Sequence, residues 1–133
     1  MPLREGADRF APAESPEGVA IATIYKICPA DLWQAAVAAG VFAGSPVDLT
    51  DGFIHFSTAA QVRETAARHF AGATDLVLVA FESESIGPGL RYEPSRGGDL
   101  FPHLYGTLDP KLALWSKPLP LGSGGHVFPR LDP

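Results

Sequence analysis

The segment Asp51-Gly-Phe-Ile-His-Phe-Ser-Thr58 decides the predicted fold, because it places a short apolar run between a turn and a helix start. If this run is a strand, its side chains alternate between two faces. Ile54 and Phe56 then face one side, while His55 and Ser57 face the other. A histidine and a serine on one face, where a strand leads into a helix, are typical of a functional site.

A second segment, Phe101-Pro-His-Leu-Tyr-Gly-Thr-Leu108, is built in the same way. In a strand over 103–108, His103, Tyr105 and Thr107 share one face and the two leucines share the other. A lone histidine more often anchors a buried turn. Two similar segments instead favour a shared polar site.

Length and composition indicate the general class of protein. The chain has 133 residues with 46% hydrophobic and 19% charged content, which suits one soluble domain with a core. A net charge of -5 argues against an extended nucleic-acid-binding surface. The single cysteine, Cys28, excludes an intrachain disulfide and is typical of a reducing compartment. No run approaches the roughly 18 apolar residues of a membrane span, so we predict a cytoplasmic protein without membrane association.

The sequence divides into three predicted regions. Residues 1–18 lack periodicity and carry charges and prolines, so we predict a flexible leader. Residues 19–120 form a predicted single α+β domain, and residues 121–133 form a Pro/Gly-rich tail. His126 is predicted to be exposed in that tail.

Hydrophobic periodicity sets the order of the predicted elements: strand, helix, strand, helix, then mostly strands. This order is typical of an α+β fold with an antiparallel sheet. The uninterrupted apolar run at 76–81 predicts a central strand covered on both faces, whereas 42–50 and 82–89 are predicted to be loops. Strands are predicted at 19–28, 53–56, 76–81, 90–93, 103–108 and 112–117, and helices at 30–39 and 59–70.

Three predicted strands carry polar side chains whose chemistry suits a phosphate-bearing ligand. Histidine serves as a general base or donates to ribose and phosphate, and arginine clamps anions. Glutamate stabilises a developing cation, and tyrosine stacks on a base or donates its hydroxyl. The alternative is that these strand faces are simply solvated. The candidates are His55 and Ser57, Arg91 and Glu93, and His103 and Tyr105.

Other chemistries have weaker support. His55, Glu93 and His103 could converge on a metal, although no HxH or HExxH pattern is present and we assign no metal ligands. Ser57 lies in no nucleophile elbow and is better explained as a helix cap. Cys28, at the end of an apolar strand, is predicted to be inert. A metal-dependent hydrolase and a non-catalytic nucleotide- or protein-binding module therefore stay open as alternatives.

Four segments together resemble a widespread bacterial family of small domains of unknown function, over about residues 21–119. Structures in that family look like the ADP-ribosyltransferase fold, which implies a split antiparallel β-sheet core with two helices near the N-terminus. The chain is also similar in this way to RNA 2′-phosphotransferases, an analogy at the level of the fold. The segments are Ile24-Tyr-Lys-Ile27, Asp51-Gly-Phe-Ile-His-Phe-Ser57, Arg91-Tyr-Glu93 and Phe101-Pro-His-Leu-Tyr-Gly106.

The resemblance implies a ligand, a cofactor and roles for individual residues. It implies that NAD or a related nucleotide binds in a His/Arg/Tyr-lined cleft, for ADP-ribosyl or phosphate transfer. His55 would bond the ribose and Arg91 the phosphate, while Glu93 or His103 would support an oxocarbenium-like centre. The implied catalytic residues are His55, Glu93 and His103, and the implied substrate-binding residues are Tyr25, Ser57, Arg91 and Tyr105.

Overall fold

The computed structural model describes residues 22–131, so the predicted leader lies outside the described residues. Strands and helices alternate early in the chain, and strands dominate later, as predicted for an α+β fold. The strands are β1 Thr23–Pro29, β2 Ile54–His55, β3 Ser57–Thr58, β4 Leu76–Glu82, β5 Leu90–Pro94, β6 Leu100–Leu104, β7 Ala113–Leu119, β8 Leu121–Gly122 and β9 Gly125–His126. The helices are α1 Ala30–Ala39, α2 Pro46–Asp51, α3 Val62–His69 and α4 Ser83–Ile86, with 3₁₀ turns at Arg96–Gly98 and Pro110–Leu112.

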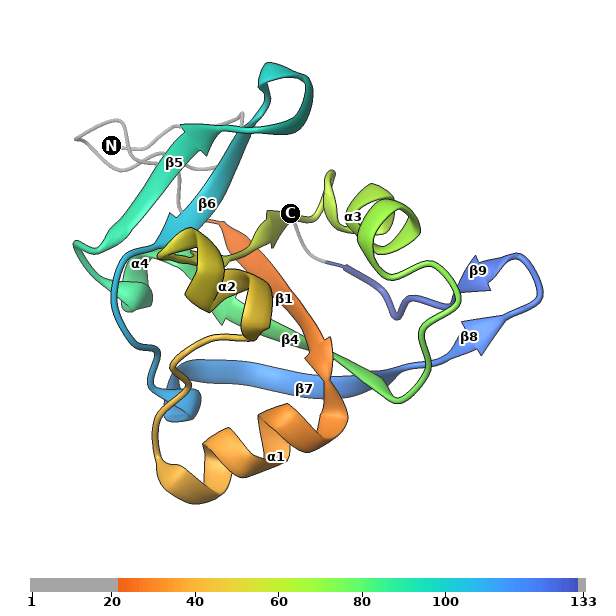
Figure 1. The fold of residues 1–133 in the computed structure, drawn as a ribbon, viewed down its shortest axis with the longest axis horizontal. Coiled ribbons are helices and arrows are strands. Elements are labelled where there is room, and N and C mark those ends of the chain that lie inside the picture. The colour runs from red at the N-terminus through yellow and green to blue at the C-terminus, as the bar shows by residue number, and fades with distance from the viewer. Residues whose placement is uncertain (1–21, 132–133) are drawn as a thin grey trace, which may run out of the picture.

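The larger sheet has four antiparallel strands in the order β3-β1-β4-β7 (Figure 1). Strand β4 lies inside it and is covered on both faces, which confirms the prediction for the apolar run. Its residues alternate between two buried clusters: Val79 and Phe81 pack on one face, and Leu78 and Ala80 pack on the other. This alternation places apolar core on both sides of the sheet.

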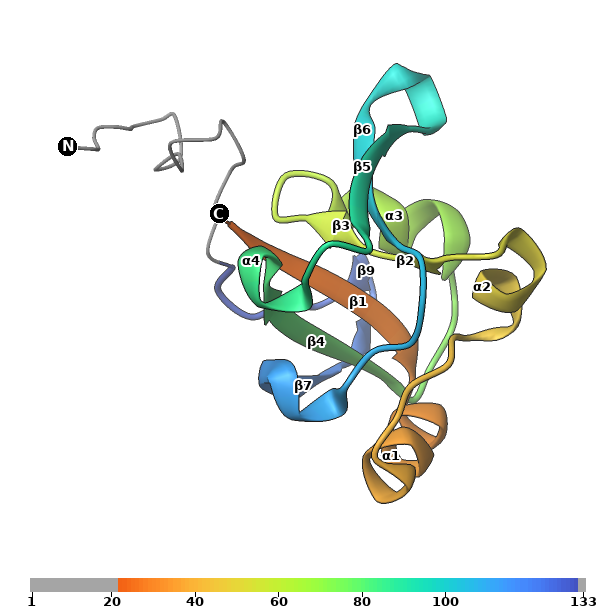
Figure 2. The same cartoon turned by 90° about the vertical axis from the view of Figure 1, so that its left-hand side faces the viewer.

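The smaller sheet has three antiparallel strands in the order β2-β6-β5. The β5–β6 hairpin projects from one end of the molecule, and α1 lies at the opposite end (Figures 1 and 2). The predicted strand over 53–56 is only partly correct, because β2 covers just Ile54–His55. Ser57–Thr58, predicted to begin a helix, instead forms β3 and pairs with β1 in the larger sheet. Between them, buried Phe56 donates its backbone N–H to the Pro102 carbonyl at 2.9 Å. The decisive segment therefore joins the two sheets.

Helix α1 matches its predicted bounds and ends at Gly40, whose φ of 79° suits a residue without a Cβ. Helix α3 is shorter than predicted, beginning at Val62, after Gln61 accepts a hydrogen bond from the Thr58 N–H at 3.0 Å. Two short helices were predicted to be loops.

Of these two observed helices, α4 forms one turn after β4. Helix α2 has the larger consequence, because it contributes to the site described below.

Strand β6 begins three residues earlier than the predicted strand at 103–108 and ends at Leu104. Proline lacks an N–H donor and is found within sheets mainly at edges, strand ends or bulges. In the structure, β2 pairs with β6 only at His103 and Leu104, so Pro102 lies where that ladder ends. Beyond the strand, Gly106 takes a φ of 133°, which turns the chain toward an isolated bridge between Leu108 and Phe42.

The predicted tail is also more ordered than its composition suggests, because β8 and β9 form a hairpin. His126 is half-buried, and its ring Nε2 lies 2.9 Å from the carbonyl oxygen of Ala73, so the prediction of an exposed tail histidine is wrong. Phe128 and Leu131 pack against the core beside α3. None of the helices between residues 22 and 131 is both long and apolar enough to cross a membrane.

Candidate functional site

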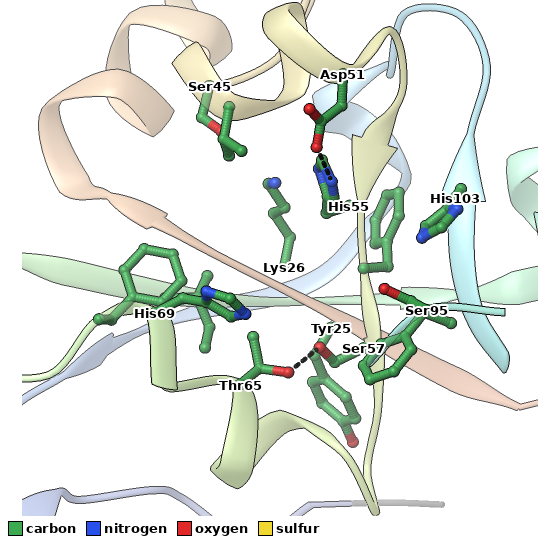
Figure 3. Close-up of a pocket in the computed structure, with 15 residues that line it drawn as sticks. Tyr25, Lys26, Ser45, Asp51, His55, Ser57, Thr65, His69, Ser95 and His103 are labelled. Atoms are coloured by element: carbon green, nitrogen blue, oxygen red, sulfur yellow. Dashed lines mark hydrogen bonds and ion pairs between the residues drawn. The ribbon is translucent and has the colours of Figure 1, made fainter. Parts of the chain in front are cut away.

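A cavity of about 440 Å³ lies where the two sheets meet (Figure 3). Both sheets and helices α2 and α3 contribute to its wall, and its size is within the ~300–1,000 Å³ of typical small-molecule sites. Its apolar lining consists of Ile27, Val47, Phe56, Phe70 and Phe101. Its other lining residues are Tyr25, Lys26, Ser45, Asp51, His55, Ser57, Thr65, His69, Ser95 and His103.

One row of the smaller sheet brings together three predicted site residues. His103 on β6 pairs in register with His55 on β2 and with Arg91 on β5. Residues directly opposite each other in an antiparallel sheet share a face, and the two imidazole rings lie 5.6 Å apart between centroids. The neighbouring pair, Ile54 and Leu104, faces the buried core instead. The alternation expected from the sequence therefore separates a polar face from a core face.

His103 is buried and held by Glu93, whose Oε1 lies 2.8 Å from the ring Nδ1. The same oxygen accepts a hydrogen bond from the Tyr105 hydroxyl at 2.7 Å. These two hydrogen bonds lower the pKa of Glu93, while the bond to Glu93 raises the pKa of Tyr105. Arg91 lies over the Tyr105 ring, 5.7 Å from its centroid. Glu93 thus fixes the orientation of the His103 ring.

His55 is held by a second carboxylate, that of Asp48 on α2. Asp48 Oδ1 lies 2.6 Å from the His55 Nδ1 and accepts the His55 backbone N–H at 3.1 Å, while Oδ2 accepts the Ser45 N–H at 2.8 Å. Lys26 from β1 donates to both oxygens, at 2.8 and 3.0 Å. Both Lys26 and Asp48 are buried, with side chains only 4% and 1% exposed. This buried ion pair fixes α2 and His55 against the larger sheet.

The electrostatics of the pair follow from its burial. Burial alone would raise the pKa of Asp48, but the hydrogen bond to His55 and the charge of Lys26 outweigh it and hold that pKa well below its ordinary value. Burial lowers the pKa of Lys26, and the neighbouring Asp48 carboxylate opposes that shift. Asp48 is therefore ionised at neutral pH.

The other ring nitrogen of His55 faces a different carboxylate. Its Nε2 lies 3.0 Å from Asp51 Oδ2, at the last residue of α2. Here both side chains are partly exposed, 32% for His55 and 44% for Asp51. Figure 3 shows the Asp51 carboxylate pointing at the imidazole ring from the α2 side of the cavity. The Nδ1 side of the His55 ring therefore faces a buried carboxylate, and the Nε2 side faces an exposed one.

Aromatic contacts order the polar face of the smaller sheet. The Phe53 ring stacks on His103, with centroids 4.1 Å apart and an interplanar angle of 25°. It also lies 4.6 Å from His55 and 5.3 Å from Tyr105. Phe53 therefore restricts the rings around the row without contributing a polar group.

On the side of the cavity away from α2, the hydroxyl groups of Ser57 on β3 and Thr65 on α3 form a hydrogen bond, with 2.9 Å between their oxygens. Tyr25 is 1% exposed and packs against Trp115, with ring centroids 6.0 Å apart. His69, at the end of α3, also contributes to the wall. This side therefore combines hydroxyl groups with a buried aromatic ring (Figure 3).

Residues 27–116 match the profile of a family described as "Protein of unknown function (DUF952)". The chain belongs to this family. The chain is similar to the crystal structure of protein CC0527 from Caulobacter crescentus, with 48% sequence identity and a TM-score of 0.75, covering 78% of this chain and 91% of that one. Its solution NMR structure is also 48% identical, with a TM-score of 0.71, covering 78% and 90%. No curated protein matches the chain.

The DUF952 membership agrees with the predicted family of unknown function, and the structure shows where each predicted site residue lies. Tyr25, His55, Ser57 and His103 line the cavity. Arg91, Glu93 and Tyr105 lie outside its lining, on β5 and just after β6. Within residues 22–131, no group of three His, Cys, Asp or Glu side chains is placed to hold a metal ion. Cys28 is buried, and burial raises the pKa of its thiol to about 11, in keeping with the predicted inert role.

Sequence reasoning missed three charged residues of the site. Asp48 and Asp51 lie on α2, whereas the sequence predicted a loop up to residue 50 and a turn at Asp51. The pattern Ser45-Pro-Val-Asp48 is a helix-start signal, with a serine N-cap, proline at the first position and an acid at the third. Lys26 gave a second signal, because a lysine within a buried strand requires a partner of opposite charge.

Proposed function

We propose that this DUF952 protein binds NAD or a related nucleotide in the cavity and transfers an ADP-ribosyl or phosphate group from it. The observation that carries the proposal is the in-register row His55–His103–Arg91, because it lines up two imidazoles and a guanidinium on one sheet face. Each imidazole has its Nδ1 fixed by a carboxylate. On His103 this arrangement leaves Nε2 for a ligand or a proton, whereas the Nε2 of His55 lies 3.0 Å from Asp51 Oδ2.

The proposal includes an ADP-ribosyltransferase-like core for the fold. Its support is the division of the strands into two antiparallel sheets, with the cavity where they meet. Residues 54–58, which leave one sheet and enter the other, supply His55 and Ser57 to the wall. Fold likeness alone does not carry a reaction, so the chemistry is argued from the side chains.

The cavity wall suits the parts of a nucleotide. Phe70, Phe101 and Val47 offer an apolar surface for a base. The ribose and its phosphate would lie against His55 and Ser57, which donate and accept hydrogen bonds. Arg91, beyond the cavity lining on the same row, would hold a second phosphate of a dinucleotide.

In ADP-ribosyl transfer, the bond between the ribose C1′ atom and the nicotinamide nitrogen breaks, and its electron pair leaves with nicotinamide. The acceptor oxygen bonds to C1′ and loses its proton. We assign that proton to His103 Nε2, since Glu93 accepts the hydrogen bond from Nδ1. The carboxylate behind the ring then stabilises the imidazolium that forms. Glu93 is in this proposal a positioning residue for His103.

Ligand-observed NMR tests the binding step with NAD, ADP-ribose, AMP and a 2′-phosphorylated RNA end. We expect at least one of them to bind, and His103→Ala to weaken it about tenfold or more by removing a buried hydrogen-bonding group. Arg68→Ala is the matched control, because Arg68 is exposed on α3 and pairs only with Glu64 among the contacts described. Equal binding by the parent and His103→Ala would refute the assigned site. Binding without any chemical product would favour the non-catalytic module.

A further inference from the structure

The two carboxylates of α2 hold His55 at opposite ends of its ring, and only one of them is buried. Asp48 Oδ1 lies 2.6 Å from Nδ1, and Asp51 Oδ2 lies 3.0 Å from Nε2. A carboxylate accepts hydrogen bonds but does not donate them when ionised. Both contacts are therefore hydrogen bonds only when both ring nitrogens carry a proton, with Nε2–H pointing at Asp51.

Replacing Asp48 should destabilise the fold, because its carboxylate also accepts hydrogen bonds from Lys26 and two backbone N–H groups. Asp51 differs, since its side chain is 44% exposed and His55 is its one described partner. Both Asp51 and His55 line the cavity. A rotation of the Asp51 side chain would thus uncover the Nε2–H without disturbing the buried pair.

We propose that the Asp51 carboxylate occupies the place beside His55 Nε2 where the phosphate of a ligand binds. A bound phosphate then displaces this carboxylate and accepts the hydrogen bond from Nε2. This inference rests on the proposed function and specifies its ligand class. The Lys26 charge is already neutralised by Asp48, so the Asp51 charge opposes an anion until its side chain moves. Asp51 therefore reduces the affinity for phosphorylated ligands and leaves the affinity for neutral nucleosides nearly unchanged.

The test compares AMP with adenosine, which differ by the phosphate, in the parent chain and in Asp51→Asn. Removing one partly exposed opposing charge should raise AMP affinity about three- to fivefold, while adenosine affinity changes less than about twofold. Asp31→Asn is the charge-matched control, because Asp31 is exposed in the first turn of α1, outside the cavity lining. Asp51→Ala repeats the measurement if the asparagine variant unfolds.

Several results would overturn the inference. Unchanged AMP affinity in Asp51→Asn would show that Asp51 does not compete, and weaker AMP binding would show that Asp51 itself contacts the ligand. An equal gain for adenosine would show that the effect is not tied to the phosphate.

Inorganic phosphate separates this inference from the proposed function. The His55 ring resonances are followed by NMR during a phosphate titration of both chains. If nucleotides bind neither the parent protein nor Asp51→Asn, the proposed function fails. A phosphate response that is stronger in Asp51→Asn would still support the role of Asp51, and an equal or absent response would overturn it. If nucleotides bind the parent protein and Asp51→Asn equally well, only the inference about Asp51 fails.

Discussion

His55 and His103 are neighbours in one row of the sheet, yet the carboxylates that hold them lie in opposite environments. The Asp48 side chain is 1% exposed and paired with buried Lys26, whereas the Glu93 side chain is 35% exposed and shares one oxygen between His103 and Tyr105. Asp48 also joins α2 to β1, while Glu93 joins only the strands of one hairpin. The comparison predicts that the contact between Asp48 and His55 contributes more to folding stability than the contact between Glu93 and His103 does.

The largest effect is expected for Asp48→Ala, which leaves the Lys26 ammonium buried without its carboxylate. Breaking a buried ion pair costs about 3–5 kcal/mol of the free energy of unfolding. Urea unfolding followed by tryptophan fluorescence measures this, with Trp33 and Trp115 as reporters. Glu64→Ala is the control, because it breaks the exposed pair with Arg68 and should cost less than about 0.5 kcal/mol.

A second variant distinguishes the lost charge from the lost hydrogen bonds. Lys26→Met combined with Asp48→Asn removes both charges and keeps one amide oxygen, which can accept from the backbone N–H of Ser45 or of His55 but not from both, because these donate to different oxygens of Asp48. This double variant should be more stable than Asp48→Ala by at least about 1 kcal/mol. If Asp48→Ala unfolds within about 1 kcal/mol of the parent, the buried pair does not couple His55 to folding.

Acid pH should affect the same pair next. Because the pKa of Asp48 is lower in the folded chain than in the unfolded chain, the unfolded chain binds more protons below about pH 4. The stabilisation is therefore fully present above that pH and is lost as pH falls toward the folded pKa. Between about pH 5 and pH 2, the parent should lose on the order of 2 kcal/mol more than Asp48→Asn. Equal acid-side losses in urea unfolding of both chains would contradict the coupling.

Local features of the site could be predicted from the sequence, whereas contacts between distant segments could not. Strand alternation correctly separated His55 and His103 from Ile54 and Leu104, because the period of two is a local property of the backbone. It could not show that the chain changes sheets at Phe56, since that depends on contacts with distant β1 and β6.

The missed part of the site has a similar cause. The composition of the segment before Asp51 favoured a loop, and the helix-start signal at Ser45 is short and local. Asp48 belongs to the site because it pairs with Lys26, which lies 22 residues away in sequence. A pairing at such a distance follows from tertiary structure, so the local sequence pattern did not reveal the contact between Lys26 and Asp48.

The smallest effect on folding is expected at the other carboxylate. Glu93→Gln should change the melting temperature by less than about 2 °C, since its side chain is partly exposed and forms no buried ion pair. It should nevertheless slow any transfer reaction about tenfold, because an amide stabilises the His103 imidazolium less well than a carboxylate does. Tyr105→Phe removes only the second hydrogen bond to Glu93 and should slow the reaction less. A large loss of stability in Glu93→Gln would show that both histidines are coupled to folding alike, and the contrast between the two carboxylates would then have no functional meaning.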